Sequence, residues 1–247
     1  MLTSYKKPFL PLIQLIGTII ENVKLKDPPI IIGGCGRSGT TILLSILSAH
    51  KEILACPKEL NLFNSNPKRI DRLYTFLLKN GIPRKARRWC EKTPRSVRHI
   101  KEIDQHFKGK FKYIHIVRDG RDVILSNHPK APGRYWIEPE RWVRDVSAGL
   151  EFEHHPSVLL IKYESLILNY DETITTVCEF LDLPVSPEIM NWHNYATVKR
   201  NEAYYGKVEK ISAASIGKWQ DASNTKRVND LLQIPEALHL LKKLDYL

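Results

Sequence analysis

The fold of this chain follows from one stretch, Pro29-Ile30-Ile31-Ile32-Gly33-Gly34-Cys35-Gly36-Arg37-Ser38-Gly39-Thr40-Thr41. Its apolar, β-branched isoleucines predict a short buried strand. The glycines that follow permit a tight turn, and the apolar residues of 42–50 recur at helical spacing. Together these elements predict an anion-binding site, because free backbone N–H groups converge at the helix N-terminus and the helix dipole favours negative charge.

The predicted loop lacks the lysine of nucleotide-hydrolysing enzymes. In a G-x-x-x-x-G-K-[ST] loop that lysine contacts the transferred phosphates, and the hydroxyl that follows binds magnesium. Gly34 and Gly39 have the same spacing, but Thr40 occupies the lysine position and a cation stands inside the loop at Arg37. This arrangement suits a nucleotide whose transferred group has less charge than a γ-phosphoryl group and needs no metal, such as a sulfuryl group.

The pattern Gly-x-x-Arg-Ser-Gly-Thr-Thr at 34–41 resembles the 5′-phosphosulfate loop of sulfotransferases that use 3′-phosphoadenosine 5′-phosphosulfate (PAPS). The resemblance is strongest to tyrosylprotein sulfotransferases and their bacterial relatives, with local resemblance to heparan sulfate sulfotransferases. It implies an α/β fold of the P-loop type, with a central parallel sheet flanked by helices. It implies PAPS as the cofactor, with 3′,5′-adenosine bisphosphate (PAP) as its product, and no metal. The loop residues expected to bind PAPS are Gly36, Arg37, Ser38, Gly39, Thr40 and Thr41.

Composition limits the domain organisation and the partners. The chain has 247 residues, of which 43% are hydrophobic and 26% are charged. This length and composition predict one domain, 1–247, with 1–28 as an N-terminal helical appendage. A net charge of +11 attracts polyanions, whether nucleic acid, a membrane surface, an anionic cofactor or an acidic acceptor. No nucleic-acid-binding signature accompanies the charge, so we expect no nucleic-acid partner. The cysteines are widely separated and form no C-x-x-C pair, which predicts reduced thiols and no zinc site.

The N-terminal residues 9–20 are mostly apolar and follow Lys6 and Lys7. The run is shorter than the about 20 residues that span a bilayer, and no small-residue cleavage site follows it. We therefore expect no transmembrane segment but an amphipathic helix that packs on the domain of a cytoplasmic protein, with peripheral contact to a membrane as the alternative. Tyrosylprotein sulfotransferases usually carry an N-terminal membrane anchor, and the chain departs from them here.

A carboxylate follows the next predicted strand, which covers 53–56. Glu59 lies just beyond this strand, and ligands of open α/β sheets bind outside the carboxyl ends of the strands. A carboxylate there can take the proton of an acceptor hydroxyl; a solvated surface glutamate is the alternative. The Lys-Glu-x-x-x-Phe pattern at 58–63 resembles heparan sulfate sulfotransferases. In both related groups a glutamate at this place is the general base, which the resemblance implies for Glu59.

Two later segments resemble further parts of the sulfotransferase site. Lys92-Thr93-Pro94 matches the family's Lys-(Ser/Thr/Asp)-Pro element, whose lysine contacts sulfate, so Lys92 would stabilise charge on the transferring group. Residues 111–117 alternate and predict a central strand that ends at Arg118, and a helix is expected from 123 with Ser126 two turns into it. The family's strand Arg and the Ser eight residues later bind the 3′-phosphate, and Arg118 and Ser126 have this spacing. Lys130 falls where tyrosylprotein sulfotransferases have a further basic contact.

The C-terminal part contains two more matches. Residues 157–166 predict a strand with a polar exit and resemble the family's (Lys/Arg)-Tyr-Glu-x-Leu segment, whose tyrosine, here Tyr163, approaches the cofactor. Residues 207–219 resemble the cofactor lid, in which Lys218 would contact the 3′-phosphate end and Trp219 would cover the nucleotide. The R-K-G-x-x-G pattern of cytosolic sulfotransferases is absent. The tail 231–247 predicts one amphipathic helix.

These observations predict a sulfotransferase that moves a sulfuryl group from PAPS to an acceptor hydroxyl by in-line displacement. Glu59 is the expected base, and Arg37 and Lys92 are expected to stabilise the transferring group. The alternatives are a metal-dependent P-loop kinase, which Thr40 disfavours, and a non-enzymatic polyanion binder, which the charge alone suggests. The acceptor stays open between a protein tyrosine in an acidic peptide, a glycan and a small molecule, because the basic segment 66–88 has no recognisable motif. No pattern predicts the oligomeric state.

Overall fold

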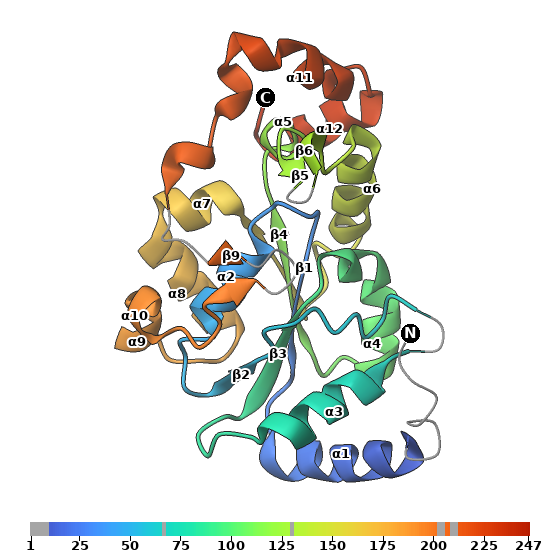
Figure 1. The fold of residues 1–247 in the computed structure, drawn as a ribbon, viewed down its shortest axis with the longest axis vertical. Helices are drawn as coiled ribbons and strands as arrows, with labels where there is room; N and C mark the ends of the chain where they lie inside the picture. Colours follow the sequence, from blue (N-terminus) through green and yellow to red (C-terminus); the bar gives the residue numbers. More distant parts are fainter. Residues whose placement is uncertain (1–9, 66–67, 129–130, 202–205, 208–211) are drawn as a thin grey trace.

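A five-stranded sheet runs through the centre of the molecule (Figure 1), and every neighbouring pair of its strands is parallel. The computed structural model describes residues 10–65, 68–128, 131–201, 206–207 and 212–247. The strand order is β2-β3-β1-β4-β7. The strands are β1 (Ile30–Gly33), β2 (Ile53–Ala55), β3 (Arg88–Lys92), β4 (Lys112–Val117) and β7 (Val158–Lys162). The predicted central parallel sheet is therefore confirmed.

Helices cover both faces of the sheet, as a parallel sheet requires. Because side chains alternate along a strand, Ile30 and Ile32 pack into one core cluster and Ile31 into another. One face carries α2 (Thr40–Leu47), α7 (Tyr163–Leu168), α8 (Tyr170–Phe180), α9 (Pro187–Met190) and α10 (Trp192–Tyr195). The other carries η2 (Pro94–His99), α4 (Ile100–Phe107) and α6 (Pro139–Leu150).

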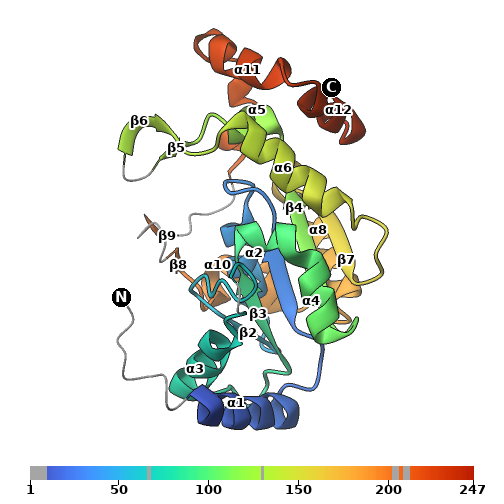
Figure 2. The ribbon, with the colours of Figure 1, turned by 90° about the vertical axis from the view of Figure 1, so that its right-hand side faces the viewer.

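The two ends of the molecule are covered by different helices (Figure 2). α1 (Leu10–Lys24) packs on α3 (Ile70–Asn80) at one end. α5 (Gly120–Val123), α11 (Thr225–Leu232) and α12 (Pro235–Lys243) lie at the other. The short elements are β5 (Asn127–His128), β6 (Ala131–Tyr135), β8 (Arg200–Asn201), β9 (Gly206–Lys207), η3 (Ala213–Ser215), η4 (Lys218–Gln220) and η5 (Ala222–Asn224).

Three predicted elements differ from the structure. The helix after Arg118 ends at Val123, so Ser126 lies beyond it and not two turns into a helix. The hairpin β5–β6 follows Ser126 instead, and the Trp136 N–H donates to the Ser126 carbonyl at 2.9 Å. The tail forms α11 and α12 rather than one helix, because Pro235 lacks a backbone N–H and suits the start of a new helix. The strand of 157–166 ends at Lys162, and α7 begins at Tyr163.

The predicted N-terminal helix, α1, packs on the domain. Gly17 is buried at the crossing with α3, where a Cβ would lie 2.2 Å from Tyr74 Cγ, so the helices approach closely only because this residue is glycine. Glu21 faces inward and accepts a hydrogen bond from Trp89 Nε1 at 2.7 Å. Among the described residues, no helix is both long enough and apolar enough to span a membrane.

Candidate active site

The loop between β1 and α2 contains two glycines that no other residue can replace without strain. Gly34 has a φ of 147° and Gly39 a φ of 94°, in the region that favours glycine. A Cβ at Gly34 would lie 2.3 Å from the Ile116 carbonyl oxygen, and one at Gly39 would lie 2.5 Å from the Tyr163 ring. The loop therefore folds tightly against the end of β4 and the start of α7. Between the glycines, Arg37 is exposed and has a positive φ of 72°, a conformation that clusters at functional sites in residues other than glycine.

The Ser38 hydroxyl is buried and makes no hydrogen bond to any residue that the structure describes. Buried polar groups are almost always hydrogen-bonded, so this orphaned oxygen indicates that a ligand atom belongs at the loop. Gly39 precedes α2, and no side chain within the described ranges caps the first turn of this helix. The N–H groups at the start of α2 therefore have the character of an anion site.

Arg118 follows β4 and reaches across to the loop. Its Nη1 donates to the Arg37 carbonyl at 3.1 Å, and its Nη2 donates to the Ser215 carbonyl. The guanidinium carbon lies 4.6 Å from the centre of the Tyr163 ring, and the Tyr163 hydroxyl lies 2.8 Å from Ser215 Oγ. The structure thus brings Arg37, Arg118 and Tyr163 together. The Arg118 Nε is also buried and has no hydrogen-bond partner among the described residues.

Asp122 is a site residue that the sequence did not predict. Its carboxylate accepts hydrogen bonds from the backbone N–H groups of Gly217, at 2.8 Å, and Trp219, at 3.1 Å. Arg118 Nη2 lies 3.9 Å from the same carboxylate. Burial raises the pKa of Asp122, and the hydrogen bonds and Arg118 oppose this increase. Asp122 ties the C-terminal segment to α5, and the only sequence signal was an acid four residues after Arg118.

The C-terminal segment is placed by stacking as well. The Arg121 guanidinium lies 3.6 Å from the centre of the Trp219 ring, while Lys218 is exposed. Ser126 makes its hydrogen bonds through the backbone, to Val123 and Trp136. The predicted contact at Lys130 and the lid residues 208–211 lie outside the described residues.

The predicted base and the predicted sulfate-binding lysine form an ion pair. β3 ends at Lys92, whose Nζ lies 2.6 Å from Glu59 Oε1. The Lys92 side chain is 4% exposed and that of Glu59 is 27% exposed, so Glu59 is not the fully solvated surface residue of the alternative interpretation. The segment after Lys92 is bonded to the loop strand, since the Thr93 N–H donates to Ile32 and the Gly34 N–H donates to Pro94. The ion pair therefore lies one strand away from the anion loop.

Two further arginines lie beside the loop and were not predicted. Asp145 on α6 is fully buried and accepts hydrogen bonds from Arg98 Nε and, at 3.4 Å, from Arg141 Nε. A Cβ at Gly36 would lie 3.3 Å from Arg141 Nη2, which places this guanidinium against the loop. One carboxylate between two guanidinium groups leaves a net positive charge there. No sequence motif includes these two arginines, so their position beside the loop could not be predicted.

The four cysteines, Cys35, Cys56, Cys90 and Cys178, are free and buried in the structure. Burial is the main reason why the pKa of each thiol is raised. Within the described part of the chain, no group of three or more His, Cys, Asp or Glu side chains is placed to hold a metal ion.

Comparison with known proteins identifies the family. The sequence model of the Sulfotransferase family matches residues 28–76 and 71–187. This chain belongs to the sulfotransferase family. It is 24% identical to the Protein-tyrosine sulfotransferase of Drosophila melanogaster over 87% of the chain and 51% of that protein. It is also 24% identical to Protein-tyrosine sulfotransferase A of Caenorhabditis elegans over 67% of the chain and 52% of the relative. The predicted family is confirmed, and the chain spans about half the length of these sulfotransferases.

Solved sulfotransferases share the fold. The mouse sulfotransferase SULT7A1, complexed with PAP, aligns with a TM-score of 0.58 at 17% identity, over 89% of this chain and 88% of that one. The sulfotransferase domain from the curacin biosynthetic pathway aligns with a TM-score of 0.57 at 19% identity, over 90% and 98% of the two chains. The fold of this chain is therefore that of a sulfotransferase.

Proposed function

We propose that this chain transfers a sulfuryl group from PAPS to an acceptor hydroxyl. The observation that carries the proposal is the ion pair of Glu59 and Lys92, which lies one strand away from an anion loop with an orphaned Ser38 hydroxyl. Membership of the sulfotransferase family supports the reaction class. The PAP complex of the mouse sulfotransferase supports the choice of nucleotide.

The residues at the loop fit such a nucleotide. The backbone of 36–41 together with Arg37 and Ser38 would hold the 5′-phosphosulfate, and Arg118 would hold the 3′-phosphate, with Ser126 and Lys218 as further donors. Two buried atoms that have no hydrogen-bond partner among the described residues, Ser38 Oγ and Arg118 Nε, are suited to bind ligand oxygens. Arg118 Nη1 and Nη2 donate to carbonyls, so phosphate binding would replace one or both of these hydrogen bonds. Tyr163 and Trp219 would lie against the nucleotide.

Glu59 and Lys92 each keep unused hydrogen-bonding positions that the reaction needs. An ammonium group has three donors, so Lys92 keeps donors for the sulfuryl oxygens while it is paired with Glu59. A carboxylate has about four acceptor positions, so Glu59 keeps an acceptor for the substrate hydroxyl. When bound, PAPS supplies an activated sulfuryl group with a phosphate as leaving group. Glu59 takes the acceptor proton, while Lys92 and the exposed Arg37 stabilise the charge that develops.

We infer that the acceptor is anionic, as a tyrosine in an acidic peptide or a sulfated glycan is. The Arg98–Arg141 pair beside Gly36 supports this inference, because Asp145 neutralises only one of its two charges. The net charge of +11 would attract such an acceptor at long range. The similarity to protein-tyrosine sulfotransferases favours the peptide.

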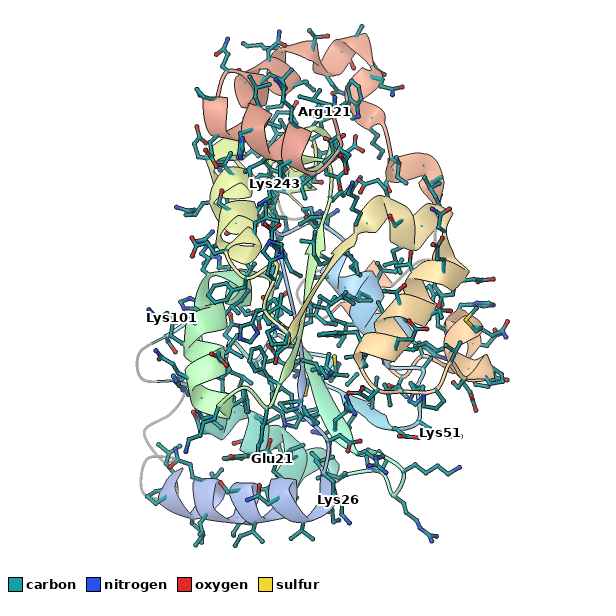
Figure 3. All side chains as sticks on the ribbon, turned by 180° about the vertical axis from the view of Figure 1, so that it is seen from behind. Glu21, Lys26, Lys51, Lys101, Arg121 and Lys243 are labelled. Atoms are coloured by element: carbon teal, nitrogen blue, oxygen red, sulfur yellow. The ribbon has the colours of Figure 1, made fainter. Side chains whose placement is uncertain are left out.

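We further propose that α1 contacts a membrane surface that contains anionic lipids. Its outer face is a row of exposed apolar residues, namely Leu12, Leu15, Ile16, Ile19 and Val23. The acid of this helix, Glu21, points toward the sheet, and Lys26 lies near its C-terminal end (Figure 3). Lys24, Arg84 and Lys85 are also exposed. An apolar stripe with a basic border is typical of helices that lie in a bilayer interface, whereas two basic faces would repel each other in a dimer.

Calorimetry and a transfer assay test the function together. We expect PAP to bind without metal, to bind more tightly than Mg²⁺–ATP, and to lose affinity in Arg118→Ala. Glu59→Gln should bind PAP like the wild type but lose turnover by about 100-fold or more, because a positioned base contributes on that order. A preference for Mg²⁺–ATP would contradict the proposed donor. Wild-type turnover in Glu59→Gln would remove this residue from the role of base.

A further inference from the structure

Glu91 is a buried carboxyl that the proposed reaction does not use. It precedes Lys92 on β3, is 2% exposed, and accepts a hydrogen bond from the Leu60 N–H at 3.0 Å. The same carboxylate oxygen accepts the hydroxyl hydrogen of Thr93. Thr93 Oγ1 in turn accepts the Asn61 N–H at 3.2 Å.

Three consecutive residues of β3 and its exit therefore hold three consecutive residues of the base-bearing loop. Lys92 holds the Glu59 carboxylate, Glu91 holds the backbone of Leu60, and Thr93 holds the backbone of Asn61. We call the contacts of Glu91 and Thr93 the base clamp. The Leu60 N–H and the Thr93 hydroxyl both donate to Glu91 Oε1. Both hydrogen bonds are strongest when the Glu91 carboxyl is deprotonated, because a charged acceptor forms hydrogen bonds about twice as strong as a neutral one.

The loop held by the base clamp has an uncommon backbone conformation. Asn61 has a φ of 52°, which a residue other than glycine adopts at a cost and which persists only where the surroundings enforce it. The Asn61 side chain donates to the Glu59 carbonyl at 3.0 Å, and Arg72 Nη1 from α3 donates to the Leu60 carbonyl at 2.8 Å. The backbone on the C-terminal side of Glu59 is thus fixed by β3 and by α3.

We propose that Glu91 and Thr93 are positioning residues that hold the Glu59 carboxylate beside Lys92 in the geometry for proton transfer. This inference rests on the proposed function, because Glu59 needs such positioning only if it acts as the base. The base clamp contacts neither Arg118 nor Tyr163 within the described residues, and its loss should leave nucleotide affinity unchanged. It should lower kcat, since a small displacement of a catalytic group reduces the rate strongly.

The base clamp also gives turnover a dependence on pH. Burial raises the pKa of Glu91 to about 7, against the hydrogen bonds of Thr93 and Leu60 and the charge of Lys92. Protonation makes Glu91 Oε1 a neutral and therefore weaker acceptor for both hydrogen bonds, so the clamp loosens as the pH falls through about 7. The other titratable groups that face Glu91 are Glu59, Cys56, Cys90 and Tyr113. Burial raises the pKa values of the two thiols and of the phenol, so these three groups stay neutral near pH 7.

The test compares sulfuryl transfer and PAP binding in the full chain and in variants at positions 91 and 93. Thr93→Val removes the hydroxyl and should lower kcat by about 10- to 100-fold, with PAP affinity within about twofold of the wild type. Thr93→Ser restores the hydroxyl and should recover most of the rate. Glu91→Gln, which is close in shape, should lower kcat and abolish the decline near pH 7. Ser96→Ala is the matched control, since it deletes another buried hydrogen bond nearby, to Tyr113 at 3.0 Å, and should leave kcat unchanged.

The outcomes separate the base clamp from the proposed function. A wild-type chain that binds PAP but transfers no sulfuryl group to any acceptor contradicts the function itself. If the wild type is active and Thr93→Val and Glu91→Gln match it, the base clamp has no role in positioning. A parallel loss of PAP affinity, or a Thr93→Ser variant as slow as Thr93→Val, would also overturn the inference, because each would indicate a general structural effect. If Glu91→Gln does not fold, the comparison of Thr93→Val with Thr93→Ser still decides whether the base clamp positions Glu59.

Discussion

Asp122 should control whether the C-terminal segment stays attached to the nucleotide end of the site. Its carboxylate accepts two backbone hydrogen bonds, from Gly217 and Trp219, and a hydrogen bond to a charged group contributes about 1.5–3 kcal/mol. Taking the lower value for both bonds gives about 3 kcal/mol for the attachment. Since about 1.4 kcal/mol is a factor of ten, Asp122→Ala should open the segment about 100-fold more often.

Hydrogen exchange followed by mass spectrometry measures this opening directly. In peptides that cover 212–224, the amides of Gly217 and Trp219 should lose about 100-fold protection in Asp122→Ala and less in Asp122→Asn, which keeps one acceptor oxygen. Asp221→Ala is the matched control, because Asp221 caps the neighbouring Ser223 N–H at 2.8 Å and does not hold Gly217 or Trp219. Wild-type exchange at Gly217 and Trp219 in Asp122→Ala would refute the assignment of this attachment to the carboxylate.

Three further predictions concern other parts of the molecule. Burial lowers the pKa of His115 from 6.5 to about 3, so the unfolded chain binds the proton more readily than the folded chain. The free energy of unfolding should therefore fall by about 1.4 kcal/mol per pH unit as the pH decreases between these two pKa values. In denaturant titrations His115→Leu should lose this pH dependence, and an unchanged dependence would assign it to other groups. Arg141→Gln should raise the KM for an acidic peptide by about 10-fold while PAP affinity stays constant, and an unchanged KM would remove the arginine pair from acceptor binding. Leu15→Ser combined with Ile19→Ser should abolish co-sedimentation with phosphatidylserine vesicles, and equal binding of both proteins would locate membrane contact elsewhere.

The sequence by itself determined the parts of the site that are local in the chain. The glycines of 34–39 and the apolar runs on either side predicted the strand, the anion loop and α2, because turn geometry and helix periodicity are encoded within a few residues. The order of the motifs placed Glu59, Lys92 and Arg118 after strands, and parallel topology brings the carboxyl ends of such strands to one edge. The Glu59–Lys92 ion pair follows from that rule, although its distance does not.

Only the tertiary structure decided the contacts between segments that are far apart in sequence. Helical spacing was expected to continue past Val123, but the hairpin β5–β6 begins there and removes Ser126 from a helix. Asp122 reaches Gly217, and Glu91 reaches Leu60, across separations that no periodicity records. A buried carboxylate must find donors wherever the fold supplies them. Such partners are selected by tertiary packing, which is why the sequence pattern revealed the loop and the strand ends but not the side chains that hold them in place.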